Sequence, residues 1–290
     1  MRVTLIHNEA AGDARSPAAV ARALAAHGHT VVVSARPGSA PEALALDEVD
    51  LVVAAGGDGT IATTARALAG TSATLAVVPL GTANNIARAL GVPRGTNAAI
   101  AAWPALQRRR LDLGIATGPW GERLFVESVG GGLLAHGMVV MDRREYTSPT
   151  TTAQLARARR AFLDVLSRLA PVRWTFTVDD ERVDGEFLFV EALNIAVIGP
   201  ALRLAEASPL DGSLTVVAAA PEHRAMLERW MRHGPHRRPP CPLATWRARE
   251  VRLVAGDRLH VDDAVLDAPA AVPPDIRVRL DPGALAVLAR

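Results

Sequence analysis

Lysine is absent from the 290 residues, so all 32 Lys+Arg residues are arginine. A Walker-type P-loop is therefore excluded, because its motif requires a lysine. There is one cysteine, Cys241, which excludes an internal disulfide framework and a cysteine-rich zinc site. Aromatic residues make up only 4% of the chain, which leaves little for the stacking of bases, so we expect no nucleic acid partner.

Long apolar runs are also missing. Near the N-terminus only the short segment from Val3 to Ile6 lies between Arg2 and His7. A secretory signal needs about 7–15 apolar residues, and a membrane-spanning helix needs about 18. We therefore expect a cytoplasmic protein, and we leave open a peripheral contact with the inner face of the membrane. The hydrophobic share of 49% is high enough for a globular chain with its own core.

The first hundred residues alternate short apolar runs with helix-like segments. The predicted strands are residues 3–6, 30–35, 51–55 and 75–78. The predicted helices are residues 17–27, 41–46, 60–69, 84–90 and 97–107. Continuous apolar strands separated by helices are typical of a parallel sheet that is covered on both faces. This half is therefore predicted to be a doubly wound α/β domain.

The pattern changes near Arg110. Strand-like runs follow at residues 111–116, 124–129, 173–178, 187–198, 214–219, 245–254 and 258–261. Two helices are expected, at residues 152–169 and 222–232, the first with Leu155, Phe162, Leu166 and Leu169 on one face. The second half is predicted to be a mostly antiparallel β domain. Two final strands, at residues 276–280 and 285–288, are assigned to neither half.

The segment Gly56-Gly57-Asp58-Gly59-Thr60 directly follows the third predicted strand and opens a helix. Glycines allow a ligand to approach the backbone closely, and the free N–H groups of a helix start favour a phosphate. A carboxylate at Asp58 would repel that phosphate unless a cation intervenes, which points to Mg²⁺ or to a water network around it. The alternative interpretation is a plain tight turn.

Two further loops follow predicted strands. One contains Gly81, Thr82 and Asn84, and the other contains Asn8 and Gly12, with Arg15 just beyond it as a candidate cation. Parallel strands bring such loops together at one edge of a sheet, where α/β proteins bind ligands. Asn84 alternatively serves as a helix N-cap.

The ordered set of Asn8 and Gly12, GGDGT at 56–60 and PLGTANN at 79–85 resembles the diacylglycerol kinase catalytic-domain superfamily, in its bacterial soluble lipid kinase branch. Sphingosine and ceramide kinases are relatives. GGDGT alone is shared with NAD kinases and 6-phosphofructokinases, and the PLGTxN loop is more specific. Similar segments continue at Asp112-Leu113-Gly114, around Gly130-Gly131, and at 211–214.

The resemblance implies an NAD-kinase-like and diacylglycerol-kinase-like α/β nucleotide domain at 1–110, to which residues 281–290 return. A β-sandwich substrate domain would occupy 111–280. The resemblance also implies that the protein uses ATP and Mg²⁺ and transfers the γ-phosphate to a hydroxyl of a diacylglycerol-like lipid. The chain's partners would then be a lipid substrate and, as questions left open, a membrane surface and a second copy in a homodimer.

The resemblance also assigns roles to residues. Nucleotide-binding positions are matched by Asn8, Gly12, Gly56, Gly57, Asp58, Gly59, Thr60, Gly81, Thr82 and Asn84. Metal-site positions are matched by Asp58, Asp112 and Asp211, and the general base by Asp262. An alternative interpretation of Asp211 and Asp262 is that they are turn residues.

Several acidic positions of the family are neutral in this chain. The affected positions are Ala62, Thr63, Asn85, Thr215 and Ala264. These departures leave a nucleotide-binding regulator with weakened catalysis as one alternative. The shared GGDGT motif leaves a second, a soluble-substrate kinase of the NAD kinase type. Arginine clusters at 108–110, 143–144, 157–160 and 237–238 are candidates for contact with anionic head groups, or form a solvated basic face.

Overall fold

The computed structural model describes residues 1–8, 16–142, 151–232, 241–255, 258–266 and 274–290. The chain divides into two compact units. The first comprises Met1–Leu113 with Pro282–Arg290, and the second comprises Gly114–Asp281. Each unit is described on its own below.

The first unit is built on a parallel sheet. Its strands lie in the order β2 (Thr30–Ala35), β1 (Arg2–His7), β3 (Leu51–Gly56) and β4 (Thr74–Pro79). The C-terminal part of β18 (Asp275–Ala289) extends this sheet, because Ala286 and Val287 pair in parallel with β4. Every residue of β3 and β4 is buried, as expected for central strands of a parallel sheet.

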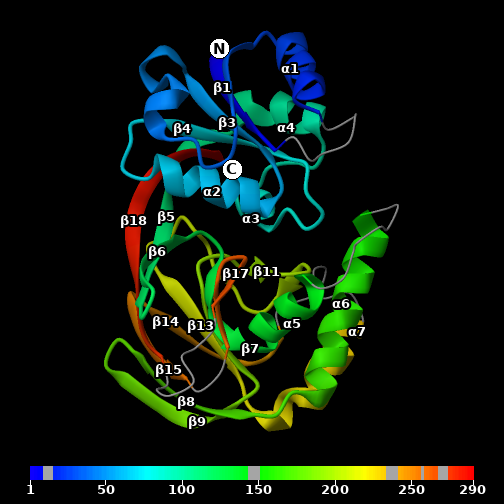
Figure 1. The fold of residues 1–290 in the computed structure, drawn as a ribbon, viewed down its shortest axis with the longest axis vertical. Coiled ribbons are helices and arrows are strands. Elements are labelled where there is room, and N and C mark those ends of the chain that lie inside the picture. Colours follow the sequence, from blue (N-terminus) through cyan, green and yellow to red (C-terminus); the bar gives the residue numbers. More distant parts are fainter. Residues whose placement is uncertain (9–15, 143–150, 233–240, 256–257, 267–273) are drawn as a thin grey trace. The chain divides into compact units, whose positions relative to one another are not determined.

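Helices cover both faces of this sheet, so the predicted α/β fold of the first half is confirmed (Figure 1). The helices are α1 (Pro17–Ala26), α2 (Asp58–Leu68), α3 (Asn85–Ala89) and α4 (Thr96–Ala102), with 3-10 turns at Pro41–Leu44, Leu46–Glu48 and Trp103–Ala105. Helix α1 begins as predicted, with the Ser16 hydroxyl accepting a hydrogen bond from the Ala19 N–H at 3.2 Å. Residues of α1 and α4 pack on the same face, in a cluster that includes Leu24 and Trp103.

The second unit is a sandwich of antiparallel β-structure, as predicted. One sheet has six strands in the order β14 (Ala244–Ala248), β13 (Leu214–Ala219), β10 (Phe189–Leu193), β7 (Ser128–Gly132), β16 (Leu259–Val261) and β17 (Ala264–Leu266). Facing it lie the first part of β18, β15 (Glu250–Ala255), β8 (Val172–Val178) and β9 (Glu181–Phe187), with the hairpin of β5 (Gln107–Gly118) and β6 (Gly121–Phe125). A short pair, β11 (Val197–Ile198) and β12 (Leu202–Arg203), lies apart.

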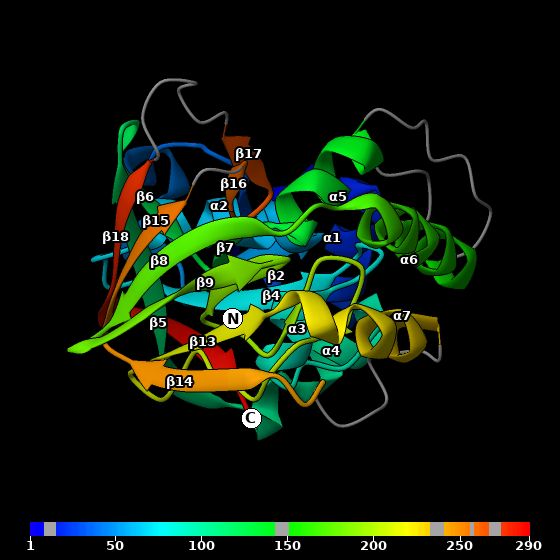
Figure 2. The same cartoon turned by 90° about the horizontal axis from the view of Figure 1, so that it is seen from below.

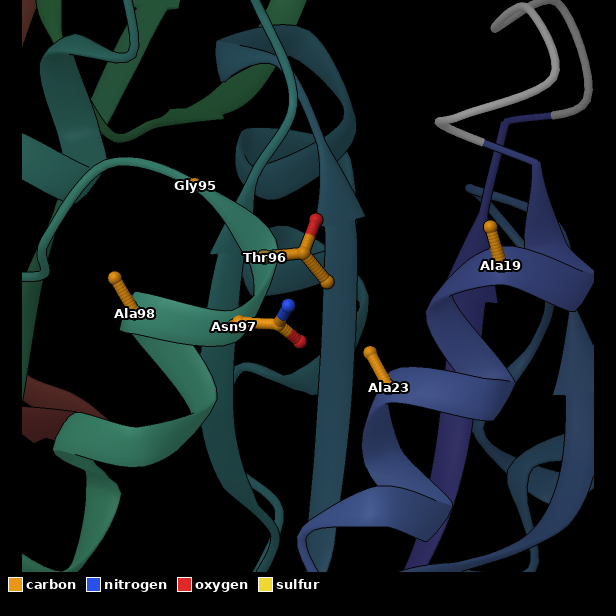
Figure 3. Close-up of a pocket in the computed structure, with 6 residues that line it drawn as sticks. All are labelled: Ala19, Ala23, Gly95, Thr96, Asn97 and Ala98. Carbon is orange, nitrogen blue, oxygen red and sulfur yellow. The ribbon is translucent and has the colours of Figure 1, made fainter.

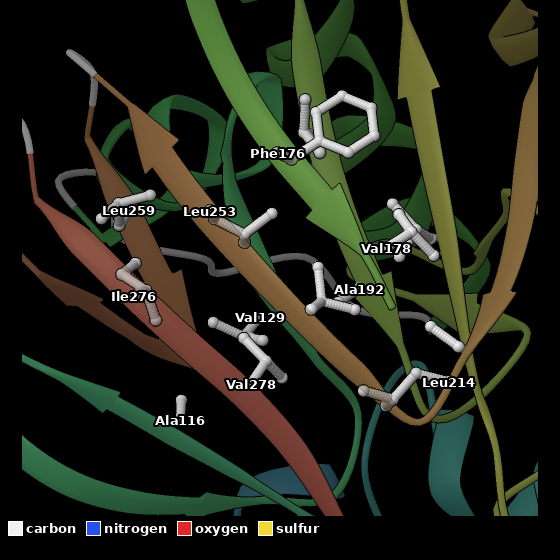
Figure 4. Close-up of a cluster of buried hydrophobic side chains, with 14 of the residues drawn as sticks. Ala116, Val129, Phe176, Val178, Ala192, Leu214, Leu253, Leu259, Ile276 and Val278 are labelled. Atoms are coloured by element: carbon white, nitrogen blue, oxygen red, sulfur yellow. The ribbon is translucent and has the colours of Figure 1, made fainter. Parts of the chain in front are cut away.

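The core of the sandwich lies between these two layers. Phe176, Leu253 and Ile276 come from the layer of β8, β15 and β18, and they meet Val129 and Ala192 of the six-stranded sheet (Figure 4). All five are fully or almost fully buried. The alternation of buried and exposed residues along the first part of β18 is typical of a strand with one face on a core.

The described part of the second unit contains three helices: α5 (Leu133–Asp142), α6 (Thr151–Arg168) and α7 (Arg224–Arg232), the last preceded by a 3-10 turn at Pro221–His223. They lie together on one side of this unit (Figure 2). Leu155, Phe162 and Leu166 of α6 are buried, as its sequence pattern predicts. None of the described helices is both long enough and apolar enough to cross a membrane.

Three predicted strands are wrong in the same way. The runs 124–129, 187–198 and 245–254 are each broken, into β6 and β7, into β9, β10 and β11, and into β14 and β15. At each first break the chain leaves one sheet of the sandwich and enters the other, and the strand-like sequence pattern does not reveal this change. Helix α5 was also missed, because its apolar residues run almost without interruption and carry little helical periodicity.

Two further boundaries differ from the prediction. The helix expected at 97–107 ends at Ala102, and Gln107 already belongs to β5. The two final strands are one strand, β18.

Candidate active site

The loops that carry the glycine motifs lie at one edge of the first unit's sheet. His7 pairs with Ala55, and Gly56 pairs with Pro79, so β1, β3 and β4 end side by side. Asn8, the GGDGT segment and the Gly81 loop follow directly from these strand ends. The predicted gathering of the loops is therefore present, whereas Gly12 and Arg15 lie outside the described residues.

Two of these loops touch through their backbones. The Leu80 N–H donates to the Gly56 carbonyl oxygen at 2.8 Å. A Cβ atom placed on Gly81 would lie 2.5 Å from the Gly57 Cα, and one on Gly57 would lie 3.3 Å from the Gly81 Cα. Gly81 therefore has to be glycine for the loops to meet, which explains the residue type at this position in steric terms.

Asn84 closes the second loop on itself. Its Oδ1 accepts a hydrogen bond from the Gly81 N–H at 2.9 Å, and its Nδ2 donates to the Gly81 carbonyl at 2.8 Å. Asn84 has a positive φ of 52° and occupies the position before α3, yet its side chain caps none of that helix's N–H groups. The capping alternative is therefore wrong for the side chain, which instead fixes the shape of the Gly81 loop.

Asp58 supplies the cap that Asn84 does not. Its Oδ1 accepts a hydrogen bond from the Ile86 N–H at 3.0 Å, at the start of α3. Burial raises the pKa of the Asp58 carboxyl, whereas the backbone N–H groups of residues 84–86 and the charge of Arg88 act in the opposite direction. The protein itself thus balances part of the Asp58 charge, for which the sequence argument required a cation.

The start of α2 is suited to a phosphate group. Gly57 is its N-cap residue and provides no side-chain hydrogen bond to the first turn. The N–H groups of a first helical turn have no partners within the helix, and the helix dipole makes this end attractive to anions. The Gly81 loop approaches Gly57 beside this point, and a phosphate group is the kind of ligand that such a helix start favours.

Two carboxylates expected to hold a metal, those of Asp112 and Asp211, have protein partners in the structure. The Asp112 Oδ1 accepts a hydrogen bond from the Gly283 N–H at 2.7 Å and joins β5 to the segment in β18. Asp211 accepts hydrogen bonds from the N–H and hydroxyl of Ser213 at 3.2 and 3.0 Å and pairs with Arg247 at 3.0 Å. These contacts agree with the alternative interpretation of Asp211 as a turn residue.

Over the described ranges, no three His, Cys, Asp or Glu side chains gather in a way that would hold a metal ion. The described residues thus form no all-protein cage for a divalent cation. Magnesium in kinases is bound largely by substrate phosphates with one or two carboxylates.

In the second unit, Asp262 lies in the two-residue turn between β16 and β17. Its φ of 50° is unusual for a residue with a side chain and costs roughly 1 kcal/mol or more. The side chain is buried, and its Oδ1 accepts hydrogen bonds from the N–H groups of Val126 and Glu127 at 3.1 and 2.8 Å. Its Oδ2 lies 3.0 Å from the Val126 N–H.

Several chain segments meet at this end of the six-stranded sheet. Ser128 is opposite Leu193, which is opposite Thr215, so the segments before β7, after β10 and before β13 lie at the same end. Asn194 donates to the Val126 carbonyl at 2.9 Å and fixes the segment that holds Asp262. Asp262 is thus a turn residue, in agreement with the alternative interpretation from the sequence. Its carboxylate is also held in place by the N–H groups of Val126 and Glu127.

Sequence reasoning missed two buried charged residues beside this turn. Glu191 and His260 have no exposed surface, and the His260 Nε2 lies 2.9 Å from the Glu191 Oε1. The available signal was the charged residue within the otherwise apolar run of β10. Arg88, whose charge acts on Asp58, was also missed.

Two hollows of the described structure lie away from these groups. One of about 410 Å³ lies between α1 and α4, where Thr96 and Asn97 point toward Ala19 and Ala23 (Figure 3). The other, of about 610 Å³, is lined by parts of α5, α6 and β8 together with Arg258. Neither is lined by a residue predicted from the sequence to be catalytic or to bind nucleotide.

The chain thus combines an α/β unit that carries paired glycine loops with a β-sandwich unit. Residues 2–116 match the model of the diacylglycerol kinase catalytic domain. The chain is 35% identical over 164 residues to a protein of Bacillus subtilis (strain 168) named diacylglycerol kinase, covering 53% of this chain but only 50% of that protein.

A longer match is 34% identical over 233 residues to a protein of Pseudomonas aeruginosa (strain UCBPP-PA14) named "Probable lipid kinase YegS-like", and it covers 77% of this chain and 73% of that protein. The chain belongs to the diacylglycerol kinase catalytic domain family, on the branch of the bacterial YegS-like lipid kinases. The family resemblance expected from the sequence motifs is confirmed, and with it a phosphotransferase class.

Solved structures show the same fold. A diacylglycerol kinase of Bacillus anthracis str. Sterne superposes with a TM-score of 0.70 at 18% identity, covering 100% of this chain and 97% of that one. Yeast NADH kinase superposes less closely, with a TM-score of 0.56 at 12% identity and coverage of 100% and 83%. At these identities the superpositions support the fold alone.

Proposed function

We propose that this protein is an ATP-dependent lipid kinase that transfers the γ-phosphate of ATP to a hydroxyl group of a diacylglycerol-like lipid. The observation that carries the proposal is the backbone contact between the Gly57 and Gly81 loops beside the uncapped start of α2. Family membership supports the class of reaction, and the names of the relatives support a lipid acceptor.

In this proposal the backbone N–H groups at the start of α2 bind the phosphates of ATP. Phosphoryl transfer depends mainly on positioning and on balancing charge on the oxygens of the transferred group, so a rigid pair of loops is an appropriate device. Asn84 keeps the Gly81 loop closed, and Asp58 keeps the α3 start against the GGDGT loop. Mg²⁺ would arrive with the nucleotide and offset the charge of its phosphates.

Asp262 is the proposed general base. As the lipid hydroxyl oxygen forms its bond to the γ-phosphorus, the bond from that phosphorus to ADP breaks, and the hydroxyl proton passes to the Asp262 carboxylate. The base must lie within about 3 Å of the hydroxyl oxygen in the complex. The backbone N–H groups of Val126 and Glu127 hold the carboxylate in place for this role.

The experiment is a kinase assay with radiolabelled ATP and Mg²⁺ on purified protein. The acceptors are diacylglycerol, sphingoid bases, phosphatidylglycerol and NAD, and Asp262→Asn is the matched variant. We expect label in a lipid product, and an Asp262→Asn variant that binds ATP normally but transfers phosphate at least about a hundredfold more slowly.

Two results would contradict the proposal. Label in NAD instead of lipid would indicate a soluble-substrate kinase. Binding of ATP without transfer to any acceptor would indicate a nucleotide-binding regulator, in line with the neutral residues at 62, 63 and 264.

A further inference from the structure

The turn that carries Asp262 rests on a buried polar row that crosses three strands. Gly130 of β7 is paired with Glu191 of β10 on one side and with His260 of β16 on the other. The Glu191 and His260 side chains meet across this glycine, with the Nε2 of His260 2.9 and 3.0 Å from the two carboxylate oxygens.

Gly130 leaves the space that this contact requires. A Cβ atom there would lie 2.5 Å from the Glu191 Cδ and 2.6 Å from its Oε2. It would also lie 2.2 Å from the backbone oxygen of Val190. The glycine of the central strand is therefore a steric condition for the Glu191–His260 pair, which is a separate observation from the pair itself.

The other ring nitrogen of His260 reaches the turn. His260 Nδ1 lies 2.9 Å from the backbone oxygen of Asp262, which can only accept a hydrogen bond, so Nδ1 donates. The Asp262 N–H in turn donates to the Ser128 carbonyl at 2.9 Å. Both backbone groups of a residue with an unusual positive φ are thus fixed, one of them by His260.

Glu191 fixes the position of that ring. Burial raises the pKa of the Glu191 carboxyl, and the charge of His260 and hydrogen bonds from His260 and Ser128 oppose that rise. Burial, the largest single effect, would lower the pKa of His260, but the charge and hydrogen bond of Glu191 together with the backbone hydrogen bond and charge of Asp262 raise the pKa overall. One proton shared between the two groups leaves the buried pair neutral overall, and in either arrangement Nδ1 keeps its hydrogen.

We propose that Glu191 and His260 are positioning residues that hold Asp262 in the conformation required of the general base. The inference rests on the proposed function, because it gives the pair a role through Asp262. Neither side chain touches the reacting atoms in this proposal. Their contribution is to keep the Asp262 carboxylate against the N–H groups of Val126 and Glu127.

The test compares variants that break the row with one that preserves it. The Glu191→Leu/His260→Leu double variant removes both hydrogen bonds without leaving a buried charge unpaired. Glu191→Gln keeps a donor facing Nε2, so a neutral His260 still donates to Asp262. His223→Gln is the control, because His223 lies beyond the opposite end of the same sheet and accepts a hydrogen bond from the Ala220 N–H.

We expect the double variant to lose about a hundredfold in kcat with an unchanged KM for ATP, because misplacing a reacting group by about 1 Å has this effect. Amide hydrogen exchange at Val126 and Glu127 should become faster. Glu191→Gln and His223→Gln should retain kcat and exchange rates close to those of the wild type. In an Asp262→Asn background, the double substitution should cause no further loss of residual activity.

A double variant with wild-type kcat and unchanged exchange at Val126 and Glu127 would overturn the proposal, as would an equal loss in the Asp262→Asn background. If the double variant does not fold, the single Glu191→Leu variant takes its place. It leaves the His260 ring without a partner at Nε2 while Nδ1 can still donate to Asp262, so we expect changes in kcat and exchange in the same direction but smaller, and larger than those of Glu191→Gln. The exchange measurement needs no substrate, so a wild type that phosphorylates no lipid would refute the proposed function while exchange still decides the role of the pair.

Discussion

Gly81 lies so close to the Gly57 backbone that a side chain at this position would collide with it. Its missing side chain permits the contact with Gly57, and the same loop is closed by Asn84. The identities of both loops could be predicted from the sequence, because each follows an apolar strand. The contact itself could not, since it depends on the pairing of β3 with β4.

The Gly81→Ala variant should bind ATP at least about tenfold more weakly, because its Cβ would push the two loops apart. Gly70→Ala is the matched control. A Cβ at Gly70 meets nothing within 4 Å, but the residue has a φ of +74°, so this variant should lose about 1–2 kcal/mol of stability and keep its affinity for ATP. Titration calorimetry and chemical unfolding measure the two quantities, and equal ATP affinity in both variants would refute the steric explanation.

Cys241 provides a prediction about pH. Burial raises the pKa of its thiol from its ordinary value of 9.0 to about 11. Above pH 9 the unfolded chain releases this proton while the folded chain retains it, so the contribution to folding stability falls as the pH rises from 9 to 11. The thiolate is the reactive form, so a thiol reagent at pH 8 should modify the native protein very slowly and the denatured protein rapidly. Rapid modification of the native protein would show that the thiol is accessible and reactive.

The contact between Glu191 and His260 could not be predicted from the sequence pattern. Their contact depends on the register that places Gly130 between them, and that register is set by tertiary pairing of β10, β7 and β16. A charged residue in an apolar strand draws attention to Glu191, but it does not identify His260 as its partner.

The predicted bounds of a strand agree with the structure where the whole predicted run lies in one sheet. Strand β2 spans Thr30–Ala35 and β13 spans Leu214–Ala219, both with the predicted bounds. The broken strands occur where the chain passes between the sheets of the sandwich, at residues 126–127, at Leu188 and at Arg249. There a short bend changes the hydrogen-bonding partners of the backbone, and hydrophobic periodicity does not reveal such a change of sheet.

Helices α5 and α6 pack closely where Gly137 of α5 faces Phe162 of α6. A Cβ on Gly137 of α5 would lie 2.5 Å from the ring of Phe162, so the ring of α6 lies directly over the glycine. Phe162 is 1% exposed, and Phe162→Ala should lower the free energy of unfolding by about 3–5 kcal/mol through the cavity that it creates. Because Phe162 belongs to the second unit, ATP affinity of the folded protein should not change. Arg160→Ala, at an exposed position of the same helix, is the control and should have little effect on stability in chemical unfolding.

Over the whole molecule, the excess of arginine over acidic residues gives a formal net charge of only +2. Any attraction to an anionic membrane must therefore come from local clusters, such as the exposed side chains of Arg157, Arg160 and Arg168 on α6. Replacing these three residues with glutamine should reduce co-flotation with anionic vesicles, at about 1 kcal/mol for each cation near the surface. The same substitutions at Arg108, Arg109 and Arg110, which are also exposed, provide a comparison of equal charge. Wild-type protein that fails to float with anionic vesicles would remove the expectation of membrane contact altogether.

The central claim is that the GGDGT and Gly81 loops bind the phosphates of ATP. The most direct measurement follows the backbone amide signals of the isotopically labelled protein by NMR while ATP and Mg²⁺ are added. We predict that the amides of residues 57–60 and 80–86 shift with ATP and scarcely respond to adenosine, which lacks the phosphates. If these amides remain unmoved while a lipid acceptor is being phosphorylated in the same sample, the nucleotide binds elsewhere and the account is contradicted.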